Sequence, residues 1–247
     1  MNLLAAFQFL TILPVKRGFT SEQNGRSAAW FPVVGLVIGA ILFGLYYVLN
    51  LVLPSSVVNG LLLAVLVILS GGLHLDGLAD TIDGLAGHRT PERRLEIMRD
   101  SRIGGIGAVG LSLFLIIEYV SLNSLPDKWV PFTLLLAPAI SRWAMVSAII
   151  SYPYARTEGL GKAFKEAVGR SEIIIASFLT LLLAVILFPM AGPVMMASAW
   201  IISSLAALYF KRQIGGLTGD TYGAINEIAF VTVLLAVNVL AFKNWLL

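Results

Sequence analysis

Long apolar stretches alternate with short polar ones along the chain. A helix needs about 20 apolar residues to cross the hydrocarbon core of a bilayer, and about seven stretches approach that length. They cover residues 28–50, 57–75, 104–124, 131–152, 171–190, 193–210 and 225–246. Because these stretches leave no segment long enough for a separate water-soluble core, the pattern predicts one all-α domain over residues 1–247, a polytopic helical bundle in a membrane.

The composition agrees with this prediction. The chain is 58% hydrophobic and 13% charged, whereas about a quarter of the residues in a soluble domain are charged. It contains no cysteine, which excludes disulfides, thiolate metal sites and cysteine nucleophiles. The basic residues are scattered between apolar stretches and do not form one soluble face, so we expect no nucleic-acid partner. Lipid is the expected partner, and a homo-oligomer is compatible with the sequence.

The distribution of lysine and arginine predicts the orientation, because cytoplasmic connections carry an excess of both. All but three of the 17 basic residues precede the first stretch or follow the second, fourth or sixth. The exceptions are Lys128, Lys243 and Arg142. We therefore expect the N-terminus inside and the C-terminus outside. Residues 74–107, 153–170 and 211–227 are the expected cytoplasmic segments. Lys16 is one of the basic residues counted before the first apolar stretch.

The densest polar segment begins at the inner end of the second stretch. Asp76, Asp80 and Asp83 have the spacing i, i+4 and i+7, which places three carboxylates on one face of a helix. Three like charges repel one another unless a cation lies among them, and Mg²⁺ binds carboxylates together with substrate phosphates. The spacing predicts a Mg²⁺ site at these three residues. The alternative is a solvated helix face just outside the membrane.

His74 precedes these acids by half a turn. It is a candidate metal ligand, proton carrier or phosphate donor, and a buried histidine with a local partner is an equal alternative.

A second polar motif follows at residues 90–107. Thr90 and Pro91 predict an N-cap and first helical position for a short helix ending near residue 99. Arg102 precedes Gly104 at the opening of the next helix, where free N–H groups favour an anion. Asp100 is a candidate metal ligand or a partner that positions an arginine.

Two later connections on the same predicted face repeat this chemistry. The first carries residues suited to grip a phosphate, namely Arg156, Gly159, Gly161 and Lys162. A flexible connector explains them almost as well. In the second, Thr218, Asp220 and Glu227 suit a sugar, a phosphate or a second cation, and ordinary helix capping is the alternative for the first two. Glu118 and Arg142 lie within apolar stretches, where we expect an ion pair.

The runs GGLHLDGLADTIDG, EIMRDSRIGGIG, ARTEGLGKAF and GGLTGDTYGAINE together resemble the cobalamin synthase family, the adenosylcobinamide-GDP ribazoletransferases. The resemblance extends over nearly the whole chain. The acids at 76, 80 and 83 match the family's acidic motif, and the later motifs match at Asp100, Arg102, Gly104, Gly159, Gly161, Asp220 and Glu227. The chain departs from the pattern at Glu118, where a lysine is often found, and at Phe230, which replaces a second acid.

The resemblance implies a Mg²⁺-dependent transfer of a cobinamide phosphoryl group from adenosylcobinamide-GDP to α-ribazole or its 5'-phosphate, with release of GMP. It also implies a prokaryotic cytoplasmic membrane. In this interpretation Asp76, Asp80 and Asp83 bind the metal, and Arg102 holds phosphate oxygens. One carboxylate or His74 accepts the proton of the attacking hydroxyl.

Two other functions share some of these features. A multi-pass transporter would use intramembrane acids to bind a coupling ion, but the acid triad maps to a helix end and no inverted repeat is visible. A CDP-alcohol phosphotransferase would use similar spaced aspartates, but the full motif of that family is missing.

Overall fold

The structure, a computed structural model, describes residues 2–15 and 17–246, so Lys16 of the charge count lies outside it. The elements are α1 (Asn2–Leu10), α2 (Ser21–Arg26), a 3₁₀ turn η1 (Ser27–Trp30), α3 (Phe31–Leu49), α4 (Ser55–Leu69), α5 (Leu73–Leu85), α6 (Pro91–Ile97), α7 (Gly105–Asn123), α8 (Val130–Ser151), α9 (Leu160–Ala167), α10 (Arg170–Leu187), α11 (Ala191–Ile214) and α12 (Gly219–Phe242). The only strand pairing in the described part is one isolated bridge. The all-α prediction is confirmed.

Six helical segments are long and apolar enough to cross a membrane, and the bent pair α4 and α5 makes a seventh. The six are α2, η1 and α3 taken together, α7, α8, α10, α11 and α12. They overlap six of the seven predicted stretches. The predicted stretch 57–75 is broken. Gly71 and Gly72 adopt positive φ angles of 62° and 70°, which glycine tolerates best, and α5 turns by 88° from α4.

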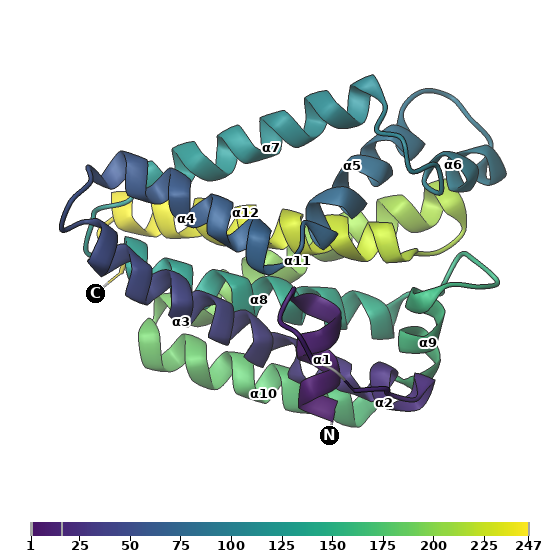
Figure 1. Cartoon of the computed structure of the whole chain (residues 1–247), viewed down its shortest axis with the longest axis horizontal. Helices are drawn as coiled ribbons and strands as arrows, with labels where there is room; N and C mark the ends of the chain where they lie inside the picture. Colours follow the sequence, from purple (N-terminus) through teal and green to yellow (C-terminus); the bar gives the residue numbers. More distant parts are fainter. Residues whose placement is uncertain (1, 16, 247) are drawn as a thin grey trace.

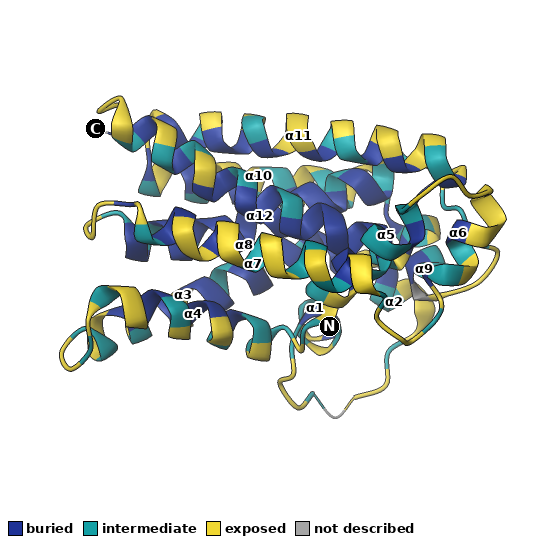
Figure 2. Ribbon diagram, turned by 90° about the horizontal axis from the view of Figure 1, so that it is seen from above, coloured by how far each residue is buried: buried dark blue, intermediate teal, exposed yellow. Residues whose placement is uncertain are grey.

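The central helix of the bundle is α8, and most of its side chains are buried (Figure 2). It packs against α3 at Gly35 and Gly39, small residues of the kind that allow close contact between membrane helices. A Cβ on Gly39 would lie 2.6 Å from the Leu135 carbonyl oxygen, so only glycine allows this approach. By contrast, α7 and α10 expose most of their apolar residues at the outside of the bundle, as expected for helices in lipid.

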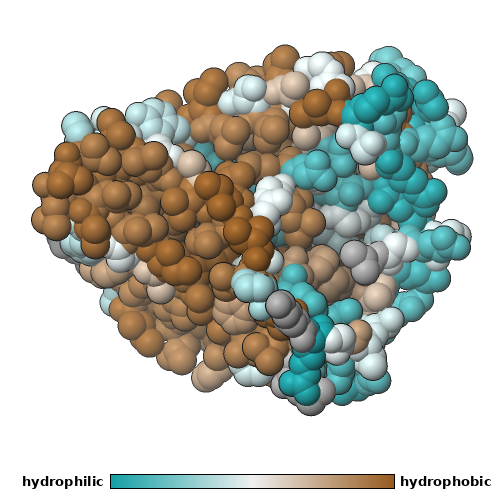
Figure 3. Space-filling view, viewed as in Figure 1, coloured by the Kyte–Doolittle hydropathy of each residue, from teal (hydrophilic) through white to brown (hydrophobic). Residues whose placement is uncertain are grey.

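The polar segments gather at one end of the molecule. Figure 1 shows α2, α5, α6 and α9 at this end, and the C-terminus at the opposite end. The space-filling view shows hydrophilic residues concentrated there, while apolar residues cover the rest of that face (Figure 3). The three segments expected on one face therefore share one end of the bundle. That this end faces the cytoplasm remains a prediction.

Candidate active site

The site is built on a close crossing of α5 and α12. A Cβ on Gly77 would lie 2.7 Å from the Asp220 carbonyl oxygen, and a Cβ on Gly223 would lie 3.1 Å from that of His74. Real Cβ atoms essentially never approach backbone atoms to within 3.0 Å, so the two backbones touch only because glycine occupies the crossing. This contact brings the acids of α5 beside the first turn of α12.

Five charged residues lie close enough at this crossing to interact, namely Asp76, Asp80, Asp83, Asp220 and Arg156. The negative charges of Asp76, Asp220 and Asp83 all act on the Asp80 carboxylate, and the positive charge of Arg156 opposes them. Arg156 donates a hydrogen bond from Nη2 to Asp220 Oδ2 over 2.7 Å. We call Asp76, Asp80, Asp220 and Arg156 the acid cluster. It joins residues that the sequence predicted separately in three polar segments.

Two loops are tied together to bring Arg156 to this cluster. The Ala155 N–H donates to the Leu217 carbonyl and the Leu217 N–H donates to the Pro153 carbonyl, both over 2.8 Å. Thr218 then caps α12: its Oγ1 accepts a hydrogen bond from the Thr221 N–H over 3.2 Å. The same hydroxyl lies 3.3 Å from Asp220 Oδ2. Capping by Thr218 thus orients Asp220.

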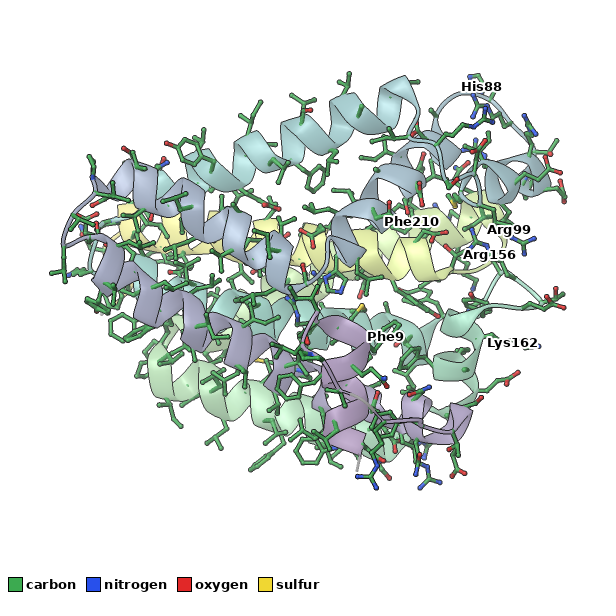
Figure 4. All side chains as sticks on the ribbon, in the orientation of Figure 1. Phe9, His88, Arg99, Arg156, Lys162 and Phe210 are labelled. Atoms are coloured by element: carbon green, nitrogen blue, oxygen red, sulfur yellow. The ribbon has the colours of Figure 1, made fainter. Side chains whose placement is uncertain are left out.

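Sequence reasoning missed Tyr154 in the first of these loops. Burial raises the pKa of its phenol, while the charge of Arg156 opposes that rise. The charges of Asp220 and Arg99 also act on Tyr154. Figure 4 shows Arg99 and Arg156 close together at the polar end, with His88 farther out. Tyr154 is therefore a neutral hydrogen-bond donor next to the acid cluster. A lone tyrosine in a loop carries no sequence signal for this role.

Asp83 does not point freely into the cluster. Its Oδ2 accepts a hydrogen bond from the Gly104 N–H over 2.7 Å, and its Oδ1 accepts one from the Gly107 N–H over 2.8 Å. A carboxylate that accepts the first N–H groups of a helix also favours the positive end of the helix dipole. The Gly104 amide expected to bind an anion therefore holds Asp83, a carboxylate of this chain.

Asp100 and Arg102 form an exposed pair. Arg102 donates from Nε to Asp100 Oδ1 over 2.9 Å and from Nη2 to Oδ2 over 2.7 Å. These hydrogen bonds lower the pKa of Asp100 to about 2. The pair lines a cavity of about 660 Å³ together with Asp83, Arg89 and Arg93. Asp83 thus lies between this cavity and the acid cluster.

The remaining predicted phosphate-binding residues lie apart from Arg156. Gly159 and Lys162 border a different cavity, of about 540 Å³, between α2 and α9. Lys162 donates to the Thr157 carbonyl over 2.7 Å. A Cβ on Gly161 would lie 2.7 Å from the Tyr154 ring, so this glycine makes room for Tyr154.

His74 and Glu227 lie beneath the acid cluster. Both are buried, and His74 Nδ1 is 3.8 Å from Glu227 Oε1. The carboxyl groups of Glu227 and Glu118 are hydrogen-bonded to each other. The prediction that Glu118 pairs with Arg142 is therefore wrong. Arg142 instead donates from Nη1 to the Pro138 carbonyl and to Ser141 Oγ, each over 3.2 Å.

The acid cluster has the donor chemistry of a Mg²⁺ site but not a complete set of ligands. Among the described residues, no three acidic or histidine side chains are arranged to hold a metal ion. Mg²⁺ usually keeps several waters and takes one or two protein carboxylates with substrate phosphates. The neighbouring Asp76 and Asp80 fit that pattern, whereas both oxygens of Asp83 already accept hydrogen bonds.

The cobalamin-5-phosphate synthase family model matches residues 2–238. The chain belongs to this family. An adenosylcobinamide-GDP ribazoletransferase of Geotalea daltonii is 40% identical over 93% of this chain and 94% of its own length. Another, from Roseiflexus sp., is 41% identical over 93% of this chain and 86% of its own length. No solved structure matches the chain.

Membership of the cobalamin-5-phosphate synthase family agrees with the resemblance seen in the sequence and favours a transferase over a transporter. The matched range includes all four polar motifs. In this family member the first, third and fourth motifs meet at the acid cluster. The second motif lines the adjoining cavity and supplies, at Gly104 and Gly107, the helix that Asp83 caps.

Proposed function

We propose that this chain is an adenosylcobinamide-GDP ribazoletransferase. It would transfer the cobinamide phosphate group to α-ribazole or α-ribazole 5'-phosphate, forming adenosylcobalamin or its 5'-phosphate and releasing GMP. The proposal is supported by two relatives that are named adenosylcobinamide-GDP ribazoletransferases. The observation that carries the proposal is the convergence of Asp80 with Asp76, Asp220 and Arg156 at the glycine crossing.

The reaction forms one phosphorus–oxygen bond and breaks another. A ribose hydroxyl oxygen attacks the phosphorus next to cobinamide, the bond to the phosphate of GMP breaks, and the hydroxyl proton passes to a base. In this proposal Arg156 and Tyr154 would donate hydrogen bonds to phosphate oxygens, because phosphoryl transfer is accelerated mainly by positioning and electrostatic stabilisation. An acid-cluster carboxylate is a better base than His74, which is buried below the cluster with only 2% of its surface exposed.

Mg²⁺ is part of the proposal. Asp76 and Asp80 would hold it, and when bound it would neutralise charge on the diphosphate. Removing divalent cations with EDTA should abolish activity, and added Mg²⁺ should restore it. The diphosphate would lie between the acid cluster and the cavity lined by Arg89, Arg93 and Arg102. We place this site on the cytoplasmic side of a prokaryotic inner membrane.

The test is an assay of purified protein in liposomes with adenosylcobinamide-GDP, Mg²⁺ and either ribazole form, following GMP and the corrinoid product. Asp80→Asn should lose turnover but keep the thermal stability of the wild type. Asp127→Asn is the matched control. Asp127 lies in the connection between α7 and α8, at the end of α7 away from the polar segments, so this variant should stay active. Wild-type turnover in Asp80→Asn would show that the acid cluster is not the active site.

A further inference from the structure

A buried network of ionisable groups lies where four helices meet below the acid cluster. Glu118 of α7, Glu227 of α12, His74 of α5 and Arg142 of α8 are each at most 8% exposed. Figure 1 shows α7 and α12 diverging toward the polar end, with α5 between them. Ionisable groups buried among membrane-spanning helices are costly unless paired.

The contacts within the network show which groups are paired. Glu227 Oε1 accepts a hydrogen bond from Asn226 Nδ2 over 3.0 Å, and the positive charge of Arg142 acts on Glu227. Glu118 is hydrogen-bonded to Glu227, and its Oε1 is buried with no hydrogen-bond partner among the described residues. Glu227 therefore has one donor, Asn226, and a cation, Arg142, nearby, whereas the one ionisable neighbour of Glu118 is itself a carboxyl group.

Two carboxyl groups form a hydrogen bond only when one of them carries a proton. If both were ionised, the network would hold two negative charges against one guanidinium, and burying the unpaired charge would be strongly destabilising. One proton makes the network neutral, with imidazole uncharged. The proton belongs on Glu118, because Glu227 already faces Arg142 and accepts from Asn226.

We propose that Glu118 is a positioning residue whose protonated carboxyl group donates a hydrogen bond to ionised Glu227. This bond joins α7 to α12. It holds Glu227 between Arg142 and His74, and so fixes α5 against α12, the contact on which the acid cluster depends. Only the activity measurement below rests on the proposed function.

The first measurement is spectroscopic and independent of activity. Infrared spectra of the full chain in liposomes should contain the carbonyl stretch of a protonated carboxyl group near neutral pH, and Glu118→Gln should remove it. Glu92→Gln is the control, because Glu92 is exposed on α6 and should leave that band in place. A spectrum in which Glu118→Gln removes no protonated carboxyl band would overturn the proposal.

The second measurement compares two substitutions at the same position. Glutamine is close in shape to a protonated glutamic acid and donates a similar hydrogen bond, so Glu118→Gln should keep kcat/KM within about threefold of wild type. Glu118→Ala loses that bond and should lower kcat/KM by roughly tenfold or more. Equal activity of the two variants would exclude the positioning role. If wild type itself is inactive with the ribazole substrates, the proposed function fails and the infrared result still decides this proposal.

Discussion

Gly77 of α5 and Asp220 of α12 are in backbone contact, and a Cβ on Gly77 would lie 2.7 Å from the Asp220 carbonyl oxygen. The position of the Asp220 carboxylate relative to Asp76 and Asp80 therefore depends on Gly77 having no Cβ atom. Gly77→Ala should push the helices apart at a cost of about 1–3 kcal/mol. If the transition state bears that whole cost, kcat/KM drops by roughly 5- to 150-fold.

The matched control for this substitution is Gly219→Ala. A Cβ on Gly219 would meet no atom within 4 Å, so alanine fits there without movement. Activity and thermal stability of both variants, measured on protein in the same detergent, would decide the matter. A fully active Gly77→Ala variant would mean that α5 and α12 need not touch.

Asp83 and Asp80 should behave differently although they share a helix face. Asp83 accepts two backbone hydrogen bonds from the start of α7, so Asp83→Asn replaces one acceptor by a donor and should cost about 1.5–3 kcal/mol of stability. Asp80→Asn should lose turnover with little change in melting temperature. Melting curves of the two variants provide the comparison. Equal loss of stability would remove the distinction between a capping and a reacting carboxylate.

The difference between Asp80 and Asp83 shows what the sequence could predict. The spacing of the three acids, the cap at Thr90 and the apolar lengths are local features. They appear in the helices as expected, except that the stretch 57–75 is broken between α4 and α5. The partner of Asp83 is more than 20 residues away and depends on how α5 and α7 cross. The role of Asp83 could not be predicted from spacing because spacing alone does not determine that crossing.

The same reasoning explains the residues that sequence patterns misplaced. Gly159, Gly161 and Lys162 form a phosphate-binding pattern, but Gly161 accommodates the Tyr154 ring and Lys162 borders another cavity. Tyr154 reaches the acid cluster only because two loops pair through Ala155 and Leu217. Pairing between loops over 60 residues apart leaves no local signal.

The exposed pair of Asp100 and Arg102 predicts a pH dependence. Hydrogen bonds from Arg102 lower the pKa of Asp100 from 3.8 to about 2. A lowered carboxyl pKa means that the pair stabilises the folded loop above about pH 4, and that this contribution is lost as the pH falls through about 2. Arg102→Gln should return the pKa of Asp100 toward 3.8.

This shift can be measured by carboxyl ¹³C NMR of protein labelled at aspartate, with the Asp100 signal assigned from Asp100→Asn. Titration of Asp100 near pH 4 in the wild type would show that the pair is not formed in solution.

The predicted orientation can be tested because the chain contains no cysteine. Ser101 and Ser124 are both exposed and lie at the two ends of α7. With the N-terminus inside, Ser101→Cys should react with a membrane-impermeant maleimide only in inverted vesicles, and Ser124→Cys only in right-side-out vesicles. Both variants keep side chains of similar size, so each controls for the other. The reverse labelling pattern would place the acid cluster outside the cell.

Arg156 and Asp220 allow a structural role to be separated from a functional one. Their ion pair is short, at 2.7 Å, and mostly shielded, with side-chain exposures of 12% and 21%. Arg156→Met should leave Asp220 without its cation and lower stability by up to about 3–5 kcal/mol, the range for a fully buried pair. Adding Asp220→Asn removes the stranded charge, so the double variant should regain much of that stability.

Activity should not return with stability in the double variant, because Arg156 is also expected to hold phosphate oxygens of the substrate. A double-mutant cycle of melting temperatures and kcat/KM values measures both effects on the same proteins. If the double variant recovers both stability and turnover, Arg156 serves only to balance the charge of Asp220. If it recovers stability alone, the guanidinium acts on the substrate, and Arg156→Lys should then retain part of the activity because it keeps the charge without the planar fork.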